Sequence, residues 1–212
     1  MQIITLPYGP LSSNMFIISY DGGCIIVDPS VDPDVVAAGF EGFERDRVRA
    51  VLITHAHFDH IYCAGKWQEL LGDVPFIMSD TDRALLADPR SNCSSMTGRG
   101  ESYTMVTRDV DSLPELFGDD PYINIRAIPT PGHTSGSVTF EVTDKGSGET
   151  VLFSGDTVFM GSVGRTDFPT GNLSEMMESI DIFKGYPVNT AIYPGHGPAT
   201  NVGTEIKINP YF

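Results

Sequence analysis

The sequence is poor in basic residues and in cysteine. Its 212 residues include only 13 lysines and arginines against 28 aspartates and glutamates, for a formal net charge of −15. Nucleic acid is therefore not an expected partner, because phosphate binding relies on clustered Lys and Arg. The three cysteines, Cys24, Cys63 and Cys93, have no recurring spacing. This argues against a disulfide framework and for reduced thiols in the cytoplasm.

Long apolar runs are also missing. No stretch approaches the roughly 18 apolar residues of a spanning helix, so no membrane partner is expected. The first ten residues, MQIITLPYGP, lack the basic start and the apolar core of a signal peptide, which again favours the cytoplasm. The 41% hydrophobic and 19% charged residues are typical of a folded globular protein. Without a linker or compositional break, residues 1–212 are expected to form one domain.

Short apolar runs alternate with turn residues along the chain. They predict strands at 3–6, 15–20, 24–27, 50–54, 76–78, 123–128, 137–142, 150–153 and 190–193, and helices at 33–40, 64–71 and 173–183, with another near Gly203. The Asp21-Gly22-Gly23 segment predicts a hairpin turn, and Asp32 predicts a helix N-cap. This mixture favours an α+β fold in which helices cover sheets. The irregular segment 87–108 is interpreted either as a wall over a site or as a mobile loop.

Histidine is scarce too, but its five copies are concentrated in motifs. The first motif, THAHFDH, contains three of them, and TPGHTSG and YPGHG contain one each. LFSGDT adds an aspartate. Seven side chains of metal-ligand type thus come from four stretches: His55, His57, Asp59, His60, His133, Asp156 and His196.

Each of these stretches follows a predicted strand and includes small residues. On an extended backbone, two histidines two residues apart can turn to the same side, as His55 and His57 would. Taken singly, His133, Asp156 and His196 could each be ordinary turn or cap residues. The fourfold repetition of the pattern nevertheless favours a metal centre. Imidazole and carboxylate ligands suit zinc, iron or manganese.

THAHFDH is a complete HxHxDH motif, and with the three downstream residues the chain resembles metallo-β-lactamase-fold hydrolases. This resemblance implies a four-layer αββα sandwich with its site at one edge of the two sheets. It further implies two divalent metal ions, with zinc expected and iron or manganese as alternatives. The implied ligand sets are these: His55, His57 and His133 for the first ion, Asp59, His60 and His196 for the second, and Asp156 as the bridge.

Within that superfamily the chain is most similar to the glyoxalase II (hydroxyacylglutathione hydrolase) branch. The complete ligand set, the Gly164-Arg165-Thr166-Asp167 segment and the ending Asn209-Pro210-Tyr211-Phe212 carry this similarity. Full-length members have a C-terminal helical domain that does not occur in these 212 residues, so we expect the chain to resemble the short bacterial form. True β-lactamases usually replace one of the ligands, which argues against antibiotic hydrolysis. Arg165 and Asp167 are expected to form an ion pair, or Arg165 to touch substrate.

The expected activity is hydrolysis of a small-molecule thioester. A hydroxide shared by two metal ions would attack the carbonyl carbon, and Asp59 would orient that hydroxide. Two other activities fit the same residues. A persulfide dioxygenase would use one iron held by His55, His133 and Asp156, and a lactone hydrolase would use the same hydroxide. The sequence predicts no oligomeric state.

Overall fold

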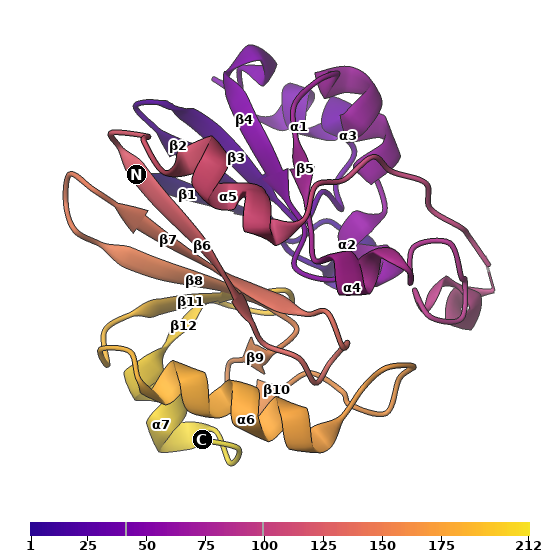
Figure 1. The fold of residues 1–212 in the computed structure, drawn as a ribbon, viewed down its shortest axis with the longest axis vertical. Coiled ribbons are helices and arrows are strands. Elements are labelled where there is room, and N and C mark those ends of the chain that lie inside the picture. Colours follow the sequence, from indigo (N-terminus) through magenta and orange to yellow (C-terminus); the bar gives the residue numbers. More distant parts are fainter. Residues whose placement is uncertain (41, 99) are drawn as a thin grey trace.

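The computed structural model describes residues 1–40, 42–98 and 100–212. Two five-stranded sheets lie face to face, and helices cover their outer sides (Figure 1). The predicted four-layer αββα sandwich is confirmed.

The first sheet has the order β1-β2-β3-β4-β5. Its strands are β1 (Gln2–Leu6), β2 (Met15–Tyr20), β3 (Gly23–Val27), β4 (Val48–Leu52) and β5 (Phe76–Ile77). The first three form an antiparallel meander, and the predicted hairpin closes where Tyr20 pairs with Gly23. Strands β4 and β5 then join parallel to β3.

The second sheet has the order β12-β11-β8-β7-β6. Its strands are β6 (Ile123–Pro129), β7 (Val138–Asp144), β8 (Thr150–Gly155), β11 (Ala191–Pro194) and β12 (Thr200–Asn201). A small hairpin of β9 (Val158–Phe159) and β10 (Ser162–Val163) follows β8. Strands β6, β7 and β8 are antiparallel neighbours, and β11 is parallel to β8. Consequently β6, β8 and β11 all run in the same direction.

Four longer helices form the outer layers (Figure 1). On the first sheet lie α1 (Pro33–Gly39) and α3 (Ala64–Leu71), and on the second lie α6 (Leu173–Lys184) and α7 (Val202–Ile208). The predicted cap of α1 is confirmed, because the Asp32 carboxylate accepts a hydrogen bond from the Asp34 N–H at 3.0 Å.

The remaining helices are a single turn or little more. They are α2 (Phe58–Ile61), α4 (Asp80–Arg83), α5 (Leu113–Phe117) and the 3₁₀ turns η1 (Pro10–Ser12), η2 (Arg45–Arg47), η3 (Ser94–Thr97) and η4 (Val110–Ser112). The sequence did not predict these elements or the β9–β10 hairpin, because one turn carries no detectable periodicity. Among the described residues, no helix has the length and apolarity needed to cross a membrane.

Alternation along the strands divides the apolar side chains among three interfaces. In β2, Phe16 and Ile18 face the second sheet, while Ile17 packs beneath the α1 and α3 layer. In β8, Phe153 faces the first sheet and Leu152 packs beneath α6. Because successive side chains of a strand point to opposite faces, each sheet can bury both of its faces at once. Three buried clusters therefore separate four layers.

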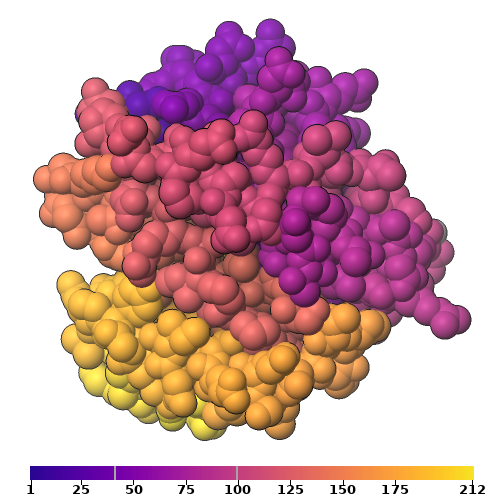
Figure 2. Space-filling model, in the orientation of Figure 1, coloured from indigo at the N-terminus to yellow at the C-terminus, as the bar shows by residue number. Residues whose placement is uncertain are grey.

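The α5 and β6 region lies across the middle of one face of the molecule, between the first half of the chain and the C-terminal helices (Figure 2).

The arrangement of strands fixes where the sequence motifs meet. Parallel β3 and β4 end at one edge of the first sheet, and the co-directional β6, β8 and β11 end at one edge of the second. Each predicted ligand follows one of these strand ends. The fold therefore brings the motifs together on one side of the sandwich, called the strand-end rim here, which consists of the loops after β4, β6, β8 and β11.

Candidate metal centre

The seven predicted side chains converge at this rim. They form three overlapping groups in which one ligand atom per residue lies within 4.8 Å of the others. The groups are His55 with His57 and His133, His55 with His60 and Asp156, and Asp59 with His60 and His196. The first and third groups are the two metal sets that the resemblance implied. All seven residues are buried except Asp156 and His196, which are partly exposed.

Two carboxylates lie between the imidazole rings. Asp156 has one oxygen 3.3 Å from His60 Nε2 and the other 3.4 Å from His133 Nε2, so it reaches toward both sides of the cluster. The Asp59 carboxylate lies 3.1 Å from His196 Nε2. Asp156 thus lies between His60 and His133, whereas Asp59 lies on the side of His196.

Three of the rings are held from outside the cluster through Nδ1. His60 Nδ1 lies 2.8 Å from Asp28 Oδ2, and His133 Nδ1 donates to the Arg165 carbonyl oxygen at 2.7 Å. His55 Nδ1 lies 3.0 Å from the hydroxyl of Thr54. A contact at one ring nitrogen fixes the orientation of the ring and turns the other nitrogen inward, which is the usual arrangement around metal-binding histidines.

The charges of the cluster suit a cation. Burial lowers the pKa of His55 well below its usual range and lowers that of His57 to about 3, so both rings are neutral and offer lone pairs. Burial also acts to lower the pKa of His60, but the Asp156 and Asp59 carboxylates outweigh it and raise that pKa. For Asp156, burial raises the pKa, yet the charge on His60 outweighs it and the carboxyl stays ionised.

Several buried nitrogen and oxygen atoms of the cluster have no hydrogen-bond partner in the protein. They are Nε2 of His55, His57 and His60, and Oδ1 of Asp156. Buried polar atoms normally find partners, because leaving one unpaired costs about 1–3 kcal/mol. Imidazole nitrogens and a carboxylate oxygen without partners, gathered in one cluster, are atoms that divalent ions would bind, with an ion taking the place of the proton that the raised pKa keeps on His60. The donor set therefore fits divalent cations.

Asp28 lies at the site, but the sequence analysis did not identify it as a functional residue, because it simply follows the predicted strand at 24–27. It is completely buried, and its carboxylate accepts hydrogen bonds from the N–H and the hydroxyl of Thr54, both at 2.8 Å, in addition to its contact with His60. Its φ of 53° is unusual for a residue other than glycine. A strained, buried carboxylate beside a ligand indicates a role at the site. The only sequence signal was an aspartate directly after a buried strand.

Glycine permits close approach of the last motif. A Cβ placed on Gly195 would collide with the Asp156 carboxylate and would lie 2.5 Å from Cε1 of His60. The loop is also held by Asn14, which is buried and donates through Nδ2 to the carbonyl oxygens of Pro194 and Gly197 at 2.8 and 2.9 Å. Sequence analysis did not identify Asn14, and no motif marks it.

A cavity of about 460 Å³ opens over the cluster. Its far wall is largely apolar and includes Leu11, Met96, Phe159 and Phe168. Met96 lies in the irregular segment 87–108, so part of that segment is a wall of the site. Arg165 lines the cavity as well, but its guanidinium makes two hydrogen bonds to Asp167, at 2.9 and 2.8 Å. The predicted ion pair is therefore present.

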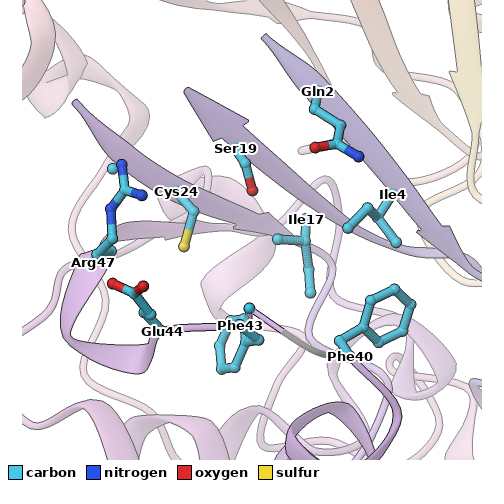
Figure 3. A pocket seen from close by; sticks show the side chains of 11 residues that line it. Gln2, Ile4, Ile17, Ser19, Cys24, Phe40, Phe43, Glu44 and Arg47 are labelled. Atoms are coloured by element: carbon cyan, nitrogen blue, oxygen red, sulfur yellow. The ribbon is translucent and has the colours of Figure 1, made fainter. Parts of the chain in front are cut away.

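A second cavity, of about 340 Å³, lies on the outer face of the first sheet (Figure 3). Ile4 and Ile17 of β1 and β2 face Phe40 and Phe43 there. At its polar end, Arg47 donates to the carbonyl oxygens of Tyr20 and Asp21. None of the metal-type groups found among the described residues includes a side chain from this cavity. In the described part of the chain, the metal-type groups all lie at the strand-end rim.

Similar sequences have hydrolase names. The chain is 34% identical to the probable metallo-hydrolase YqgX of Bacillus subtilis, over 97% of this chain and 95% of that protein. It is 27% identical to the hydroxyacylglutathione hydrolase GloC of Haemophilus influenzae, over 100% of this chain and 98% of that protein.

Solved structures agree with the fold. A di-iron-bound form of TTHA1623 matches with a TM-score of 0.81 and 30% identity over the whole of both chains. BLEG-1, a B3 metallo-β-lactamase, matches with a TM-score of 0.81 and 29% identity over 99% of both chains. Residues 8–196 match the family model of the metallo-β-lactamase superfamily. With this match, the sandwich fold and the His/Asp cluster at its rim, the chain belongs to the metallo-β-lactamase superfamily and resembles its metal-dependent hydrolases.

Proposed function

We propose that this protein is a binuclear metal-dependent hydrolase that cleaves thioesters, in the manner of glyoxalase II. The observation that carries the proposal is the rim cluster, in which five imidazoles and two carboxylates face one another beneath an open cavity. The similarity to GloC supports thioester cleavage, and the di-iron form of TTHA1623 supports two metal ions. Zinc, iron and manganese all suit the donor set.

In this proposal His55, His57 and His133 would hold one ion, Asp59, His60 and His196 would hold the other, and Asp156 would be the shared ligand. Two bound divalent ions would supply a hydroxide nucleophile at neutral pH and positive charge beside the carbonyl oxygen.

The side chains around this centre have separate tasks. The Asp59 carboxylate faces the cluster from the side of His196. There it would accept a hydrogen bond from the nucleophile that the metal ions supply and so orient it toward the carbonyl carbon. Leu11, Met96 and Phe168 form an apolar wall against which an apolar group of the substrate would pack. The thiolate leaving group, with a thiol pKa of about 8.5, needs little protonation. A dedicated general acid is therefore unnecessary.

Metal analysis and activity assays test this proposal together. The protein purified without added metal is expected to contain two divalent ions per chain and to hydrolyse S-lactoylglutathione or a simpler thioester. His55→Ala should lose at least one ion and nearly all turnover. Asp181→Asn, which changes an exposed carboxylate paired with Lys184 on α6, is the control and should keep both. Full metal content and turnover in His55→Ala would refute the assignment.

Other chemistries use the same residues and belong in the same substrate panel. The similarity to BLEG-1 makes a β-lactam such as nitrocefin a necessary substrate, although the intact ligand set argued against that activity. Lactones test the remaining hydrolytic alternative. One iron per chain, with oxygen consumed when glutathione persulfide is supplied, would instead identify a persulfide dioxygenase.

A further inference from the structure

Asp82 is a buried carboxylate outside the ligand set. It lies in the one-turn helix α4, has no exposed surface and does not line the cavity over the cluster. Three hydrogen bonds reach it. The Ala56 N–H and the Thr134 hydroxyl donate to Oδ2 at 2.8 and 2.9 Å, and the Gly136 N–H donates to Oδ1 at 2.8 Å.

These donors belong to the two loops that carry the first group of histidines. Ala56 lies between His55 and His57 in the loop after β4, and Thr134 follows His133 in the loop after β6. The two loops come from different sheets, so no strand pairing sets the distance between them. One carboxylate thus spans the gap at the level of the histidines. A backbone hydrogen bond joins the same two segments, because the Val138 N–H donates to the Thr54 carbonyl oxygen at 3.0 Å.

The chemistry of the contact requires a carboxylate. All three partners donate hydrogen bonds, and an ionised carboxylate only accepts them. An asparagine offers one oxygen and one NH₂ group. Whichever way its amide turned, the NH₂ would face the N–H of Ala56 or of Gly136, so one loop would lose its anchor.

The backbone around Asp82 is shaped to fit it. A Cβ placed on Gly136 would lie 2.5 Å from Asp82 Oδ1 and 2.6 Å from the Asp82 backbone nitrogen. Any residue but glycine at position 136 would therefore push α4 away from the loop. Burial raises the pKa of Asp82, and the three donors act against that rise. Burying a carboxylate at such a site costs free energy unless its hydrogen bonds compensate for the lost hydration.

We infer that Asp82 is a positioning residue, which fixes the spacing between the His55–His57 loop and the His133 loop and so sets the affinity of the first metal position. This inference rests on the metal centre of the proposed function. Outer residues that orient ligands typically contribute about 10- to 100-fold in metal affinity. Asp82 would act on three ligands at once through two loops, without touching any of them.

Glu205 provides a matched control. It is also completely buried and also accepts three hydrogen bonds, from the Gly161 N–H, the Thr200 hydroxyl and the Asn209 amide, at 2.8, 2.5 and 2.9 Å. Those contacts join α7 to the β9–β10 hairpin and not to the first histidine group. If loss of stability alone weakened metal binding, a substitution at Asp82 or at Glu205 would lower metal affinity. If Asp82 has a positioning role, only the substitution at Asp82 would lower it.

The test compares metal binding by the wild type, Asp82→Asn and Glu205→Gln. Each metal-free protein is titrated with Zn²⁺ against a chromophoric chelator, and its unfolding is followed by circular dichroism. Both variants should unfold at lower temperature. Asp82→Asn should weaken one of the two binding steps by about 10- to 100-fold, while Glu205→Gln should stay within about twofold of the wild type.

Gly136→Ala is the second variant, in case Asp82→Asn does not fold. It keeps the carboxylate but displaces it, and it should weaken the same binding step. Wild-type affinity in folded Asp82→Asn or Gly136→Ala would overturn the inference, and so would an equal loss in Glu205→Gln. A wild type that binds no metal would overturn the proposed function itself, which is a different result from a variant that binds as tightly as the wild type.

Discussion

The Asp28 carboxylate contacts the His60 ring at Nδ1 and so orients the side chain of this predicted ligand. Its Oδ2 faces His60 Nδ1, so that nitrogen carries a proton, and a bound metal ion would take the place of the proton on Nε2. In Asp28→Asn, an amide NH₂ at this position would donate to Nδ1 and force the proton onto Nε2. The variant should fold, because asparagine tolerates the positive φ of this position. We expect metal affinity to fall by about 10- to 100-fold.

Competition with a chromophoric chelator measures this loss. Asp32→Asn is the control, since that aspartate caps α1 and lies outside the cluster. Equal affinity in both variants would mean that the contact between Asp28 and His60 contributes nothing to binding.

The cysteines give a second prediction at the residue scale. Cys24, Cys63 and Cys93 are all buried and unpaired, and burial raises the pKa of each thiol to about 11. A raised thiol pKa keeps the proton on sulfur, so at pH 8 only about one thiol in a thousand is a thiolate, and the thiolate is the reactive form. Native protein should therefore react very slowly with Ellman's reagent at pH 8. Protein unfolded in guanidinium should release three equivalents at once, and rapid reaction of the native state would contradict the burial of these thiols.

At the scale of elements, the sequence predicted the strands and helices that hydrophobic periodicity and repeated motifs indicate. The strands before His55, His133, Asp156 and His196 were predicted because runs of β-branched residues end in small residues and a ligand. The helix α6 was predicted from its apolar face, α1 from the capping aspartate Asp32, and α3 from the glycine that ends it. What could not be predicted is what depends on contacts between distant segments. Asp28, Asp82 and Asn14 are ordinary turn-forming residues in sequence. The pairing of β3 with β4 makes Asp28 a partner of the first histidine loop, and contacts between the two sheets do the same for Asp82 and Asn14.

The η1 turn combines an unusual backbone with an exposed apolar side chain. Leu11 has a φ of 56° and is 67% exposed, yet it lines the cavity over the cluster. In Leu11→Gly, relief of the left-handed strain, about 1 kcal/mol, is offset by the greater freedom of glycine in the unfolded chain. Stability should therefore stay within about 1 kcal/mol. For an apolar thioester, loss of about 1 kcal/mol of contact should raise KM about fivefold with little change in kcat.

Steady-state kinetics and urea unfolding test this pair of expectations. Val106→Gly is the control, because Val106 is also exposed and apolar but does not line the cavity. If both variants changed KM equally, the wall formed by η1 would have no part in substrate binding.

At the scale of the whole molecule, charge is the dominant feature. The formal charge is −15, and two divalent ions would reduce it only to about −11. Among the described residues that line the cavity, Arg165 is the only lysine or arginine, and Asp167 already pairs with it. An anionic substrate thus meets net repulsion as it approaches, whereas a neutral substrate does not.

This repulsion predicts different salt responses for anionic and neutral thioesters. The screening length falls from about 30 Å at 0.01 M salt to about 8 Å at 0.15 M, which is shorter than the protein is wide. For S-lactoylglutathione, which carries a net negative charge, kcat/KM should rise about two- to fivefold over that range as the repulsion is screened. For a neutral thioester it should change by less than about twofold. A fall with salt for the anionic substrate would show instead that local positive charge at the metal centre, and not the net charge of the molecule, governs how substrate arrives.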